Sequence, residues 1–361
     1  MLFKKASQLS KLIKLLDKSD SSGVVDKLQQ ENRISYDELS AVITINLPFY
    51  APSWILKLQQ ISLPEINKLL GKKPTWKVNH DVAAMQTSSK KRSLDKIKNI
   101  IAVASGKGGV GKSTVSSNLA LALAKNGAQV GLLDADIYGP SIPTLLGVKN
   151  AKPTSADGKL MLPIEAHGIV CNSIGFLVAE EDAMIWRGPM ASKALQQVLN
   201  ETDWPELDYL IVDMPPGTGD IQLTMSQNVP VSSAVIVTTP QDVALIDAKK
   251  GVTMFNKVDT HISGIIENMS LFTCSQCGFE EAIFGTGGGE QLAKQFELPF
   301  LGKLPLHINY RQDSDQGKPT VSKNEQVTLV TPYLGLAETL AINLYRDLQP
   351  ASQQINITEV K

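Results

Sequence analysis

The stretch Ile100-Ile-Ala-Val-Ala-Ser-Gly-Lys-Gly-Gly-Val-Gly-Lys-Ser-Thr114 joins an apolar run to a glycine-rich segment. Residues 106–114 satisfy the spacing G-x-x-x-x-G-K-[ST]. In that pattern backbone amides turn inward around phosphate oxygens, with positive φ angles at the glycines, and a helix begins beneath the same anion. The apolar run predicts a buried strand over 100–104, and the residues after the glycines predict a helix over 112–126. Strand, loop and helix together predict a nucleoside triphosphate site.

Beyond this loop, apolar runs alternate with helical patterns. Strands are predicted over 129–133, 209–212, 234–238, 262–267 and 300–304, and helices over 192–201, 243–257, 289–296 and 333–348. Such alternation indicates an α/β fold, with a mostly parallel sheet and helices on both faces. We therefore expect a P-loop NTPase domain over residues 98–348.

A smaller unit precedes this domain. Residues 41–47 and 76–79 predict strands and residues 54–70 a helix, so residues 1–85 are expected to form a small α+β domain. The polar residues 86–97 are predicted to be a linker, and residues 349–361 a flexible tail. Leucines at helical spacing in the first twenty residues indicate a packed first helix, with an organelle presequence or a membrane-surface helix as alternatives.

Composition narrows the classes of function. The 361 residues include 35 Lys and Arg and 36 Asp and Glu, for a net charge of -1, which gives no global reason to expect nucleic-acid binding. No stretch approaches the roughly 20 apolar residues that span a bilayer, which excludes a transmembrane protein. No membrane partner is expected. Residues 1–98 hold 17 basic and 9 acidic side chains, a balance of +8 that suggests an acidic partner surface. Three cysteines form no disulfide framework and favour a reducing, cytoplasmic compartment.

The general motif assigns roles within the loop. Lys112 is expected to reach the β and γ phosphates, and the Ser113 hydroxyl to complete a Mg²⁺ shell. The expected ATP-contacting residues are Gly106, Lys107, Gly108, Gly109, Val110, Gly111, Lys112, Ser113 and Thr114.

Two aspartate motifs end later strands. Asp134-Ala-Asp136 and Asp213 fall at the carboxyl edge of the predicted sheet, where ligands bind in open α/β folds. Asp213 is expected to hold Mg²⁺ through a water, as a Walker B aspartate does. Met214 follows it, so no second carboxylate is available there as a general base, which favours Asp136 for positioning water.

The spacing K-G-G-x-G-K-[ST] resembles the deviant Walker A ATPases, a class of dimeric P-loop ATPases. That resemblance implies that Lys107 reaches the partner's nucleotide and stabilises charge in trans. It also implies that Asp136 polarises the attacking water, that Asp134 supports the loop, and that hydrolysis is slow.

Longer motifs narrow the family. Asp134–Ser141, Trp186–Met190, Asp213–Asp220, Thr238–Gln241 and Glu267–Ser270 are similar to those of the Mrp/ApbC iron–sulfur cluster carrier ATPases. The likeness covers about residues 98–345. It implies that Asn268 contacts adenine and that Pro305 flanks it. Arg187 lies in one of the motifs, without an assigned role. The N-terminal unit more faintly resembles a small iron–sulfur assembly domain.

The close pair Cys274-Ser-Gln-Cys277 is expected on a loop where both sulfurs face one ion. Tetrahedral zinc and [4Fe-4S] clusters usually take four protein ligands, so two subunits would supply them at a shared interface. A redox dithiol and an inert pair are the alternatives. Cys171 is expected to be a buried, inert thiol, and His167, His261 and His307 to be structural.

These expectations describe a homodimeric ATPase with ATP, Mg²⁺ and a [4Fe-4S] cluster bridging two subunits. It would take clusters from donors and deliver them to apo iron–sulfur proteins. The alternative is a protein-targeting or partitioning ATPase with structural zinc at the dimer cysteines. An electron-transfer reductase is disfavoured, because two adjacent ligands per chain leave an exchangeable, solvent-near site.

Overall fold

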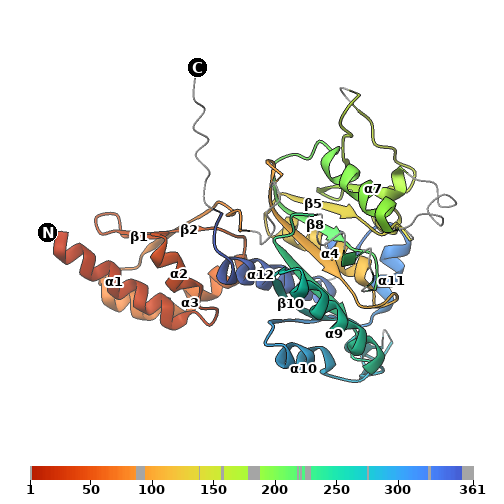
Figure 1. The fold of residues 1–361 in the computed structure, drawn as a ribbon. Helices are drawn as coiled ribbons and strands as arrows, with labels where there is room; N and C mark the ends of the chain where they lie inside the picture. The colour runs from red at the N-terminus through yellow and green to blue at the C-terminus, as the bar shows by residue number, and fades with distance from the viewer. Residues whose placement is uncertain are drawn as a thin grey trace, which may run out of the picture.

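The computed structural model describes residues 2–86, 94–137, 139–155, 158–177, 188–217, 219, 222–223, 229–274, 276–323 and 327–351. A large α/β unit and a small N-terminal unit lie side by side, with a long helix, α12, between them (Figure 1). The described elements confirm the predicted fold class.

The large unit is built on an eight-stranded sheet with the order β13-β10-β9-β4-β8-β5-β7-β6. Its strands are parallel, except that β6 runs antiparallel to β7 at one edge. Their bounds are β4 Ile97–Ala104, β5 Val130–Asp134, β6 Ile164–Ala166, β7 Ile169–Ser173, β8 Leu207–Asp213, β9 Ser233–Thr238, β10 Ile262–Glu267 and β13 Phe300–Lys303.

Helices cover both faces of this sheet, because alternate strand residues point to opposite sides. Ile101 and Val103 of β4 belong to one core with α4 and α12, whereas Ile100 and Ala102 belong to a second core with α7, α9 and α10. The bounds are α4 Lys112–Lys125, α5 Ile142–Leu145, α7 Gly188–Asn200, α9 Asp242–Lys257, α10 Gly288–Gln295, α11 Ile308–Asp315 and α12 Val327–Asp347. Short 3₁₀ turns span Ile174–Phe176 and Thr320–Ser322.

The N-terminal unit is a three-stranded sheet with three helices. Its strands, in the order β1-β2-β3, are Ile34–Asp37, Val42–Leu47 and Thr75–His80. Its helices are α1 Leu2–Ser19, α2 Val24–Gln30 and α3 Pro52–Leu70. Leu12 and Leu16 of α1 are fully buried, which confirms a packed first helix. This core continues into the large unit, where the Phe49 ring lies 5.5 Å from that of Tyr345 in α12.

Helix α12 departs from two sequence-based expectations. Among the described helices it is long and apolar enough to cross a bilayer, so the expectation that no stretch approaches that length was wrong. The structure buries most of it, with Leu336, Leu340 and Leu344 in the core beside α4. The helix also begins at Val327 instead of the predicted residue 333. The prediction placed the boundary at Pro332, but the helix includes this proline.

The ends of the two units meet. Gln86 donates its N–H to the Gln349 carbonyl at 2.8 Å, and Ala351 donates to Ala84 at 2.8 Å. Strand β4 begins at Ile97, the last residue of the predicted linker. Residues 87–93 of that linker and residues 352–361 of the predicted tail lie outside the described residues, as do Trp186, Arg187 and Asp220.

Candidate nucleotide site and cysteine hairpin

The loop between β4 and α4 has the conformation that a phosphate cradle needs at two of its glycines. Gly109 and Gly111 have φ angles of 84° and 81°, which residues other than glycine rarely adopt. Gly106 and Gly108 do not, so the expectation of positive φ angles in the loop was right for only some of its glycines. Gly106 is required for a different reason: a Cβ there would lie 2.1 Å from the backbone carbonyl carbon of Asp247 in α9.

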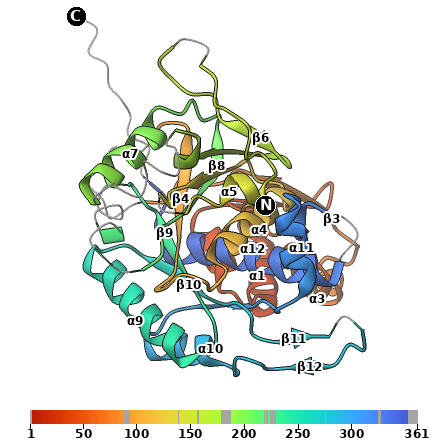
Figure 2. The ribbon, with the colours of Figure 1, turned by 90° about the vertical axis from the view of Figure 1, so that its right-hand side faces the viewer.

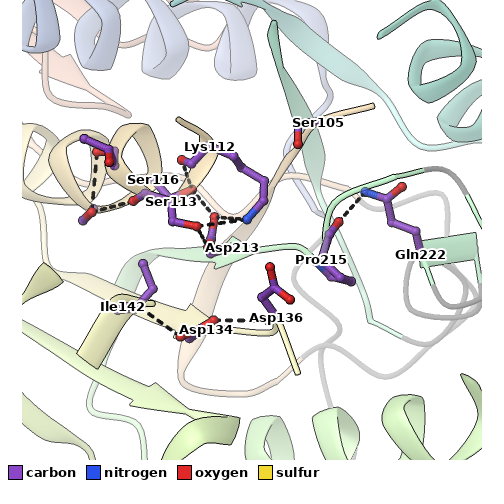
Figure 3. Close-up of polar contacts among 12 residues, drawn as sticks. Ser105, Lys112, Ser113, Ser116, Asp134, Asp136, Ile142, Asp213, Pro215 and Gln222 are labelled. Carbon is purple, nitrogen blue, oxygen red and sulfur yellow. Dashed lines mark hydrogen bonds and ion pairs between the residues drawn. The ribbon is translucent and has the colours of Figure 1, made fainter. Parts of the chain in front are cut away.

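Asp213, at the end of β8, gathers the polar groups that begin α4 (Figure 3). Its carboxylate is fully buried and lies 2.8 Å from the Lys112 ammonium. The hydroxyls of Ser113 and Ser116 each donate to it at 2.6 Å. A hydroxyl and a carboxylate this close are hard oxygen donors of the kind Mg²⁺ takes. Ser116 was missed by sequence reasoning, although its place three residues after Ser113 puts both on one helix face.

Asp134 lies beside Asp213, because β5 and β8 pair these two residues in register. It accepts hydrogen bonds at 3.1 Å from the N–H groups of Asp136 and Ile142 and from the Ser173 hydroxyl. Complete burial, and then the charge of Asp213, raise the pKa of Asp134 to about 8. The carboxylate therefore ties both ends of the 136–142 loop to the sheet edge.

Asp136 and Lys107 both lie close to the phosphate loop and the strand ends that follow it. Asp136 is 8% exposed, and Figure 3 shows its side chain between Asp213 and the Pro215 segment. Lys107 is partly exposed, and the Ser105 hydroxyl donates to its carbonyl at 2.9 Å.

A cavity of about 270 Å³ adjoins the loop. It is lined by residues of the loop and α4, of the segment after β10, of the segment after β13 and of α11 and α12, including Gly111, Thr114, Asn268, Pro305, His307 and Tyr333. The Asn268 side-chain amide donates to the Val110 carbonyl at 2.8 Å, so it is held at the loop. Mostly apolar walls with a few placed polar groups suit a planar base. The structure thus brings Asn268 and Pro305 into one pocket.

The three predicted structural histidines make backbone contacts or lie away from this edge. His307 accepts the Asn309 N–H at the start of α11, and His167 lies within 3.1 Å of the Leu146 and Gly317 carbonyls. His261 precedes β10, at the opposite edge of the sheet from the phosphate loop.

Cys274 and Cys277 lie on a hairpin formed by β11 Phe272–Thr273 and β12 Glu280–Glu281. Cys274 donates its N–H to the Phe279 carbonyl and accepts the Gly278 N–H, each at 2.9 Å. Hydrogen bonds from the backbone N–H groups of Cys277 and Gln276, and from the Cys277 thiol, hold the pKa of Cys274 below its usual range. The Cys277 thiol therefore lies within hydrogen-bonding reach of Cys274.

The hairpin offers two thiols and no more. Within the described ranges, no three His, Cys, Asp or Glu side chains are placed to hold a metal ion. Cys171 in β7 is buried, and burial raises the pKa of its thiol to about 12, as expected of an inert residue. A four-ligand site at Cys274 and Cys277 thus needs ligands from outside the described part of this chain.

The chain resembles proteins of known role in sequence and fold. Residues 96–341 match a family model described as ParA: NUBPL iron-transfer P-loop NTPase. The iron–sulfur cluster carrier protein of Escherichia coli K12 is 54% identical over 304 residues, 84% of this chain and 82% of that protein. The iron–sulfur cluster transfer protein NUBPL of Mus musculus is 48% identical over 257 residues, 71% of this chain and 80% of that protein.

A solved structure shares this similarity. The nucleotide-binding protein from Archaeoglobus fulgidus in complex with ADP is 40% identical, with a TM-score of 0.57. The match covers 64% of this chain and 90% of that one.

Proposed function

We propose that this chain, which belongs to the Mrp/ApbC/NUBPL family of P-loop NTPases, carries an iron–sulfur cluster to apoproteins under the control of ATP. One observation carries the proposal: Cys274 and Cys277 converge on a hairpin beside the sheet edge that holds the phosphate loop. The names of the bacterial and mouse relatives, a cluster carrier and a cluster transfer protein, support the choice of cargo.

The loop and its cavity support a nucleotide as the controlling ligand. Residues 106–114 would hold the phosphates, with Lys112 at the β and γ positions, while Asn268 and Pro305 would hold the base. The ADP bound to the Archaeoglobus fulgidus relative supports this assignment. Ser113 and Asp213 would hold Mg²⁺, which neutralises phosphate charge and orients the γ-phosphoryl group when bound.

Hydrolysis in this proposal depends on three side chains besides the phosphate cradle. Asp136 orients a water whose oxygen attacks the γ-phosphorus as the bond to the β–γ bridging oxygen breaks; ADP leaves with that oxygen, and the water's proton passes to the phosphate product. Asp134 holds Asp136 in place through its N–H. Lys107 of the partner subunit stabilises the charge of the transferring group. Because Met214 follows Asp213, no second carboxylate is available there as a general base, and Asp136 takes the water-positioning role. Turnover is proposed to be slow, as the resemblance to the deviant Walker A class implies.

The cluster is proposed to be a [4Fe-4S] cluster that bridges two subunits. Each chain supplies two thiolates, so two subunits related by a twofold axis near the hairpin would supply four. This is the same dimer that a trans role for Lys107 needs. A bridging site exposes its cargo when the subunits separate, which suits delivery to apoproteins and loading from cluster donors. A reducing, cytoplasmic compartment is part of the proposal, since the thiols must remain unoxidised.

Cluster transfer tests this function. After anaerobic loading with iron and sulfide, the protein should restore activity to an apo [4Fe-4S] enzyme, and ATP should change the rate. Cys274→Ser and Cys277→Ser should abolish transfer, whereas Cys171→Ala, which alters a thiol remote from the hairpin, should retain it. Bound zinc with no cluster would contradict the proposal and favour a targeting or partitioning ATPase.

A further inference from the structure

The cysteine hairpin is joined to the base cavity at its first stem. The hairpin leaves β10 after Asn268, and Ser270 donates both its N–H and its hydroxyl to the Leu304 carbonyl at 3.0 Å. Leu306 then donates its N–H to the Leu271 carbonyl at 2.8 Å. Leu306 and Asn268 both line the cavity, so this stem is tied to the cavity wall.

A buried carboxylate holds the second stem. The hairpin returns to the sheet at α10, where Gly289 donates its N–H to Glu267 Oε2 at 2.6 Å. Glu267 is the last residue of β10 and directly precedes Asn268. The approach is close, because a Cβ at Gly289 would lie 3.0 Å from the Glu267 Cβ. Glu267 thus connects the residue beside the cavity to the end of the hairpin.

Burying the Glu267 carboxylate costs free energy, which indicates that its hydrogen bond from the Gly289 N–H has a structural role. Glu267 is fully buried, its Oε1 has no hydrogen-bond partner, and no described lysine or arginine forms an ion pair with it. An apolar side chain would fill the space without that penalty. The carboxylate instead offers a charge-assisted bond to the N-terminus of α10, whose helix dipole stabilises it.

We propose that Glu267 is a positioning residue that makes the geometry of the cysteine hairpin depend on occupancy of the base cavity. When a base engages Asn268, the adjoining end of β10 is fixed, and Glu267 carries that restraint to α10 and the second stem. Both stems then hold Cys274 and Cys277 in one arrangement. The inference rests on the proposed function and extends it by naming how nucleotide reaches the cargo site.

Hydrogen–deuterium exchange on the full chain tests the inference with ADP·Mg²⁺ as the probe. In wild type, ADP should slow exchange in peptides from residues 271–289 at least about fivefold. Glu267→Gln removes the charge and should reduce that effect to less than about twofold. Glu290→Gln is the matched control, because it removes a carboxylate from the first turn of α10, next to Gly289. Among the described residues, the Glu290 carboxylate forms ion pairs with the exposed Lys294 and Lys303, so this variant should respond as wild type does.

Two further measurements guard against a failure to bind ADP or to fold. Calorimetry establishes that ADP saturates the wild type and both variants. If Glu267→Gln fails to fold, Gly289→Ala replaces it, because the added methyl group would separate α10 from Glu267. A hairpin that ADP protects equally in Glu267→Gln, or does not protect in wild type, would overturn the inference.

Cluster retention separates this outcome from that of the proposed function. In the loaded wild type, ADP should change the rate of iron loss to a chelator, and Glu267→Gln should lose that change while still holding cluster. A wild type that holds no cluster contradicts the proposed function, whereas the exchange experiment still decides the role of Glu267.

Discussion

Gly106, the first glycine of the phosphate loop, is packed directly against the backbone of α9. A methyl group there would meet the Asp247 carbonyl carbon and oxygen at 2.1 and 2.2 Å, and neither can move without shifting the helix. We therefore expect Gly106→Ala to lower the free energy of unfolding by about 2 kcal/mol or more. Gly108→Ala is the control, since nothing lies within 4 Å of a Cβ there. Equal urea midpoints for the two variants would contradict this account.

Asp134 should give the protein a characteristic dependence of stability on pH. Its folded pKa, about 8, lies above its unfolded value, so its contribution to stability is present below about pH 4 and is lost as pH rises toward 8. Asp134→Asn has no such loss. Across this window the unfolding free energy of wild type should therefore fall relative to the variant, by up to about 1.4 kcal/mol per pH unit. Urea titrations at several pH values measure the difference, and a constant difference would be inconsistent with a raised pKa.

Helix α3 receives its N-terminal cap from helix α12. The residue before α3, Ala51, offers no side-chain acceptor, and Glu338 of α12 accepts the N–H groups of Ser53 and Trp54 at 3.0 Å each. Glu338→Ala should cost about 1–3 kcal/mol of stability, because two helix donors lose a buried carboxylate. Glu65→Ala, which breaks an exposed ion pair with Lys18, should cost less than about 1 kcal/mol. If denaturant unfolding shows similar losses for both, the cap does not join the two units as described.

Most strands of the large sheet could be predicted from the sequence, because buried parallel strands appear as continuous apolar runs. The run that became β8 is an example, and all of its residues are buried. The short edge strand β6 and the helix α11 gave no such signal, since their residues are partly exposed and polar. The start of α12 was predicted too late, because proline normally ends or begins a helix and Pro332 lies inside this one. The packing of α12 against α4 outweighs that local preference.

The phosphate site was predictable to a similar degree, for a different reason. Lys112, Ser113 and Asp213 belong to motifs whose spacing carries the chemistry, and the structure brings them together. Glu338 was not singled out, and Glu267 appeared only as the first residue of a family motif, with no role assigned to it. Their roles depend on partners distant in sequence: Gly289 lies 22 residues from Glu267, and Ser53 lies 285 residues from Glu338. A single sequence contains no local pattern for such contacts.

The molecule as a whole combines the sheet edge with the phosphate loop, the cysteine hairpin and an N-terminal unit packed against α12. Figure 2 shows β11 and β12 extending from the large unit beside α10 and α9, at the side opposite β6 and α7. The hairpin also exposes Phe279 and Ile283, which are 62% and 51% accessible, and α9 exposes Val243 near its start. Exposed apolar groups on and beside the cysteine hairpin support the proposal that a second subunit covers this surface.

Mixing two inactive variants tests whether Lys107 acts across that interface. Lys107→Ala and Asp136→Asn should each hydrolyse ATP poorly. In a mixed dimer, the site with intact Asp136 receives Lys107 from the other subunit. An equal mixture should regain about a quarter of the wild-type rate, since half of the dimers are mixed and each has one complete site. No recovery, with subunit exchange verified by mass spectrometry, would assign Lys107 to its own subunit's nucleotide.

Native mass spectrometry after anaerobic loading with iron and sulfide decides whether the cluster bridges two subunits, because it reports subunit number and bound iron in one spectrum. We predict a dimer that carries about four irons and four sulfides. The iron and the sulfide should both be lost when Cys274 or Cys277 is replaced by serine. A monomer carrying a complete cluster, or a dimer carrying one zinc ion and no iron, would contradict a cluster bridging two subunits.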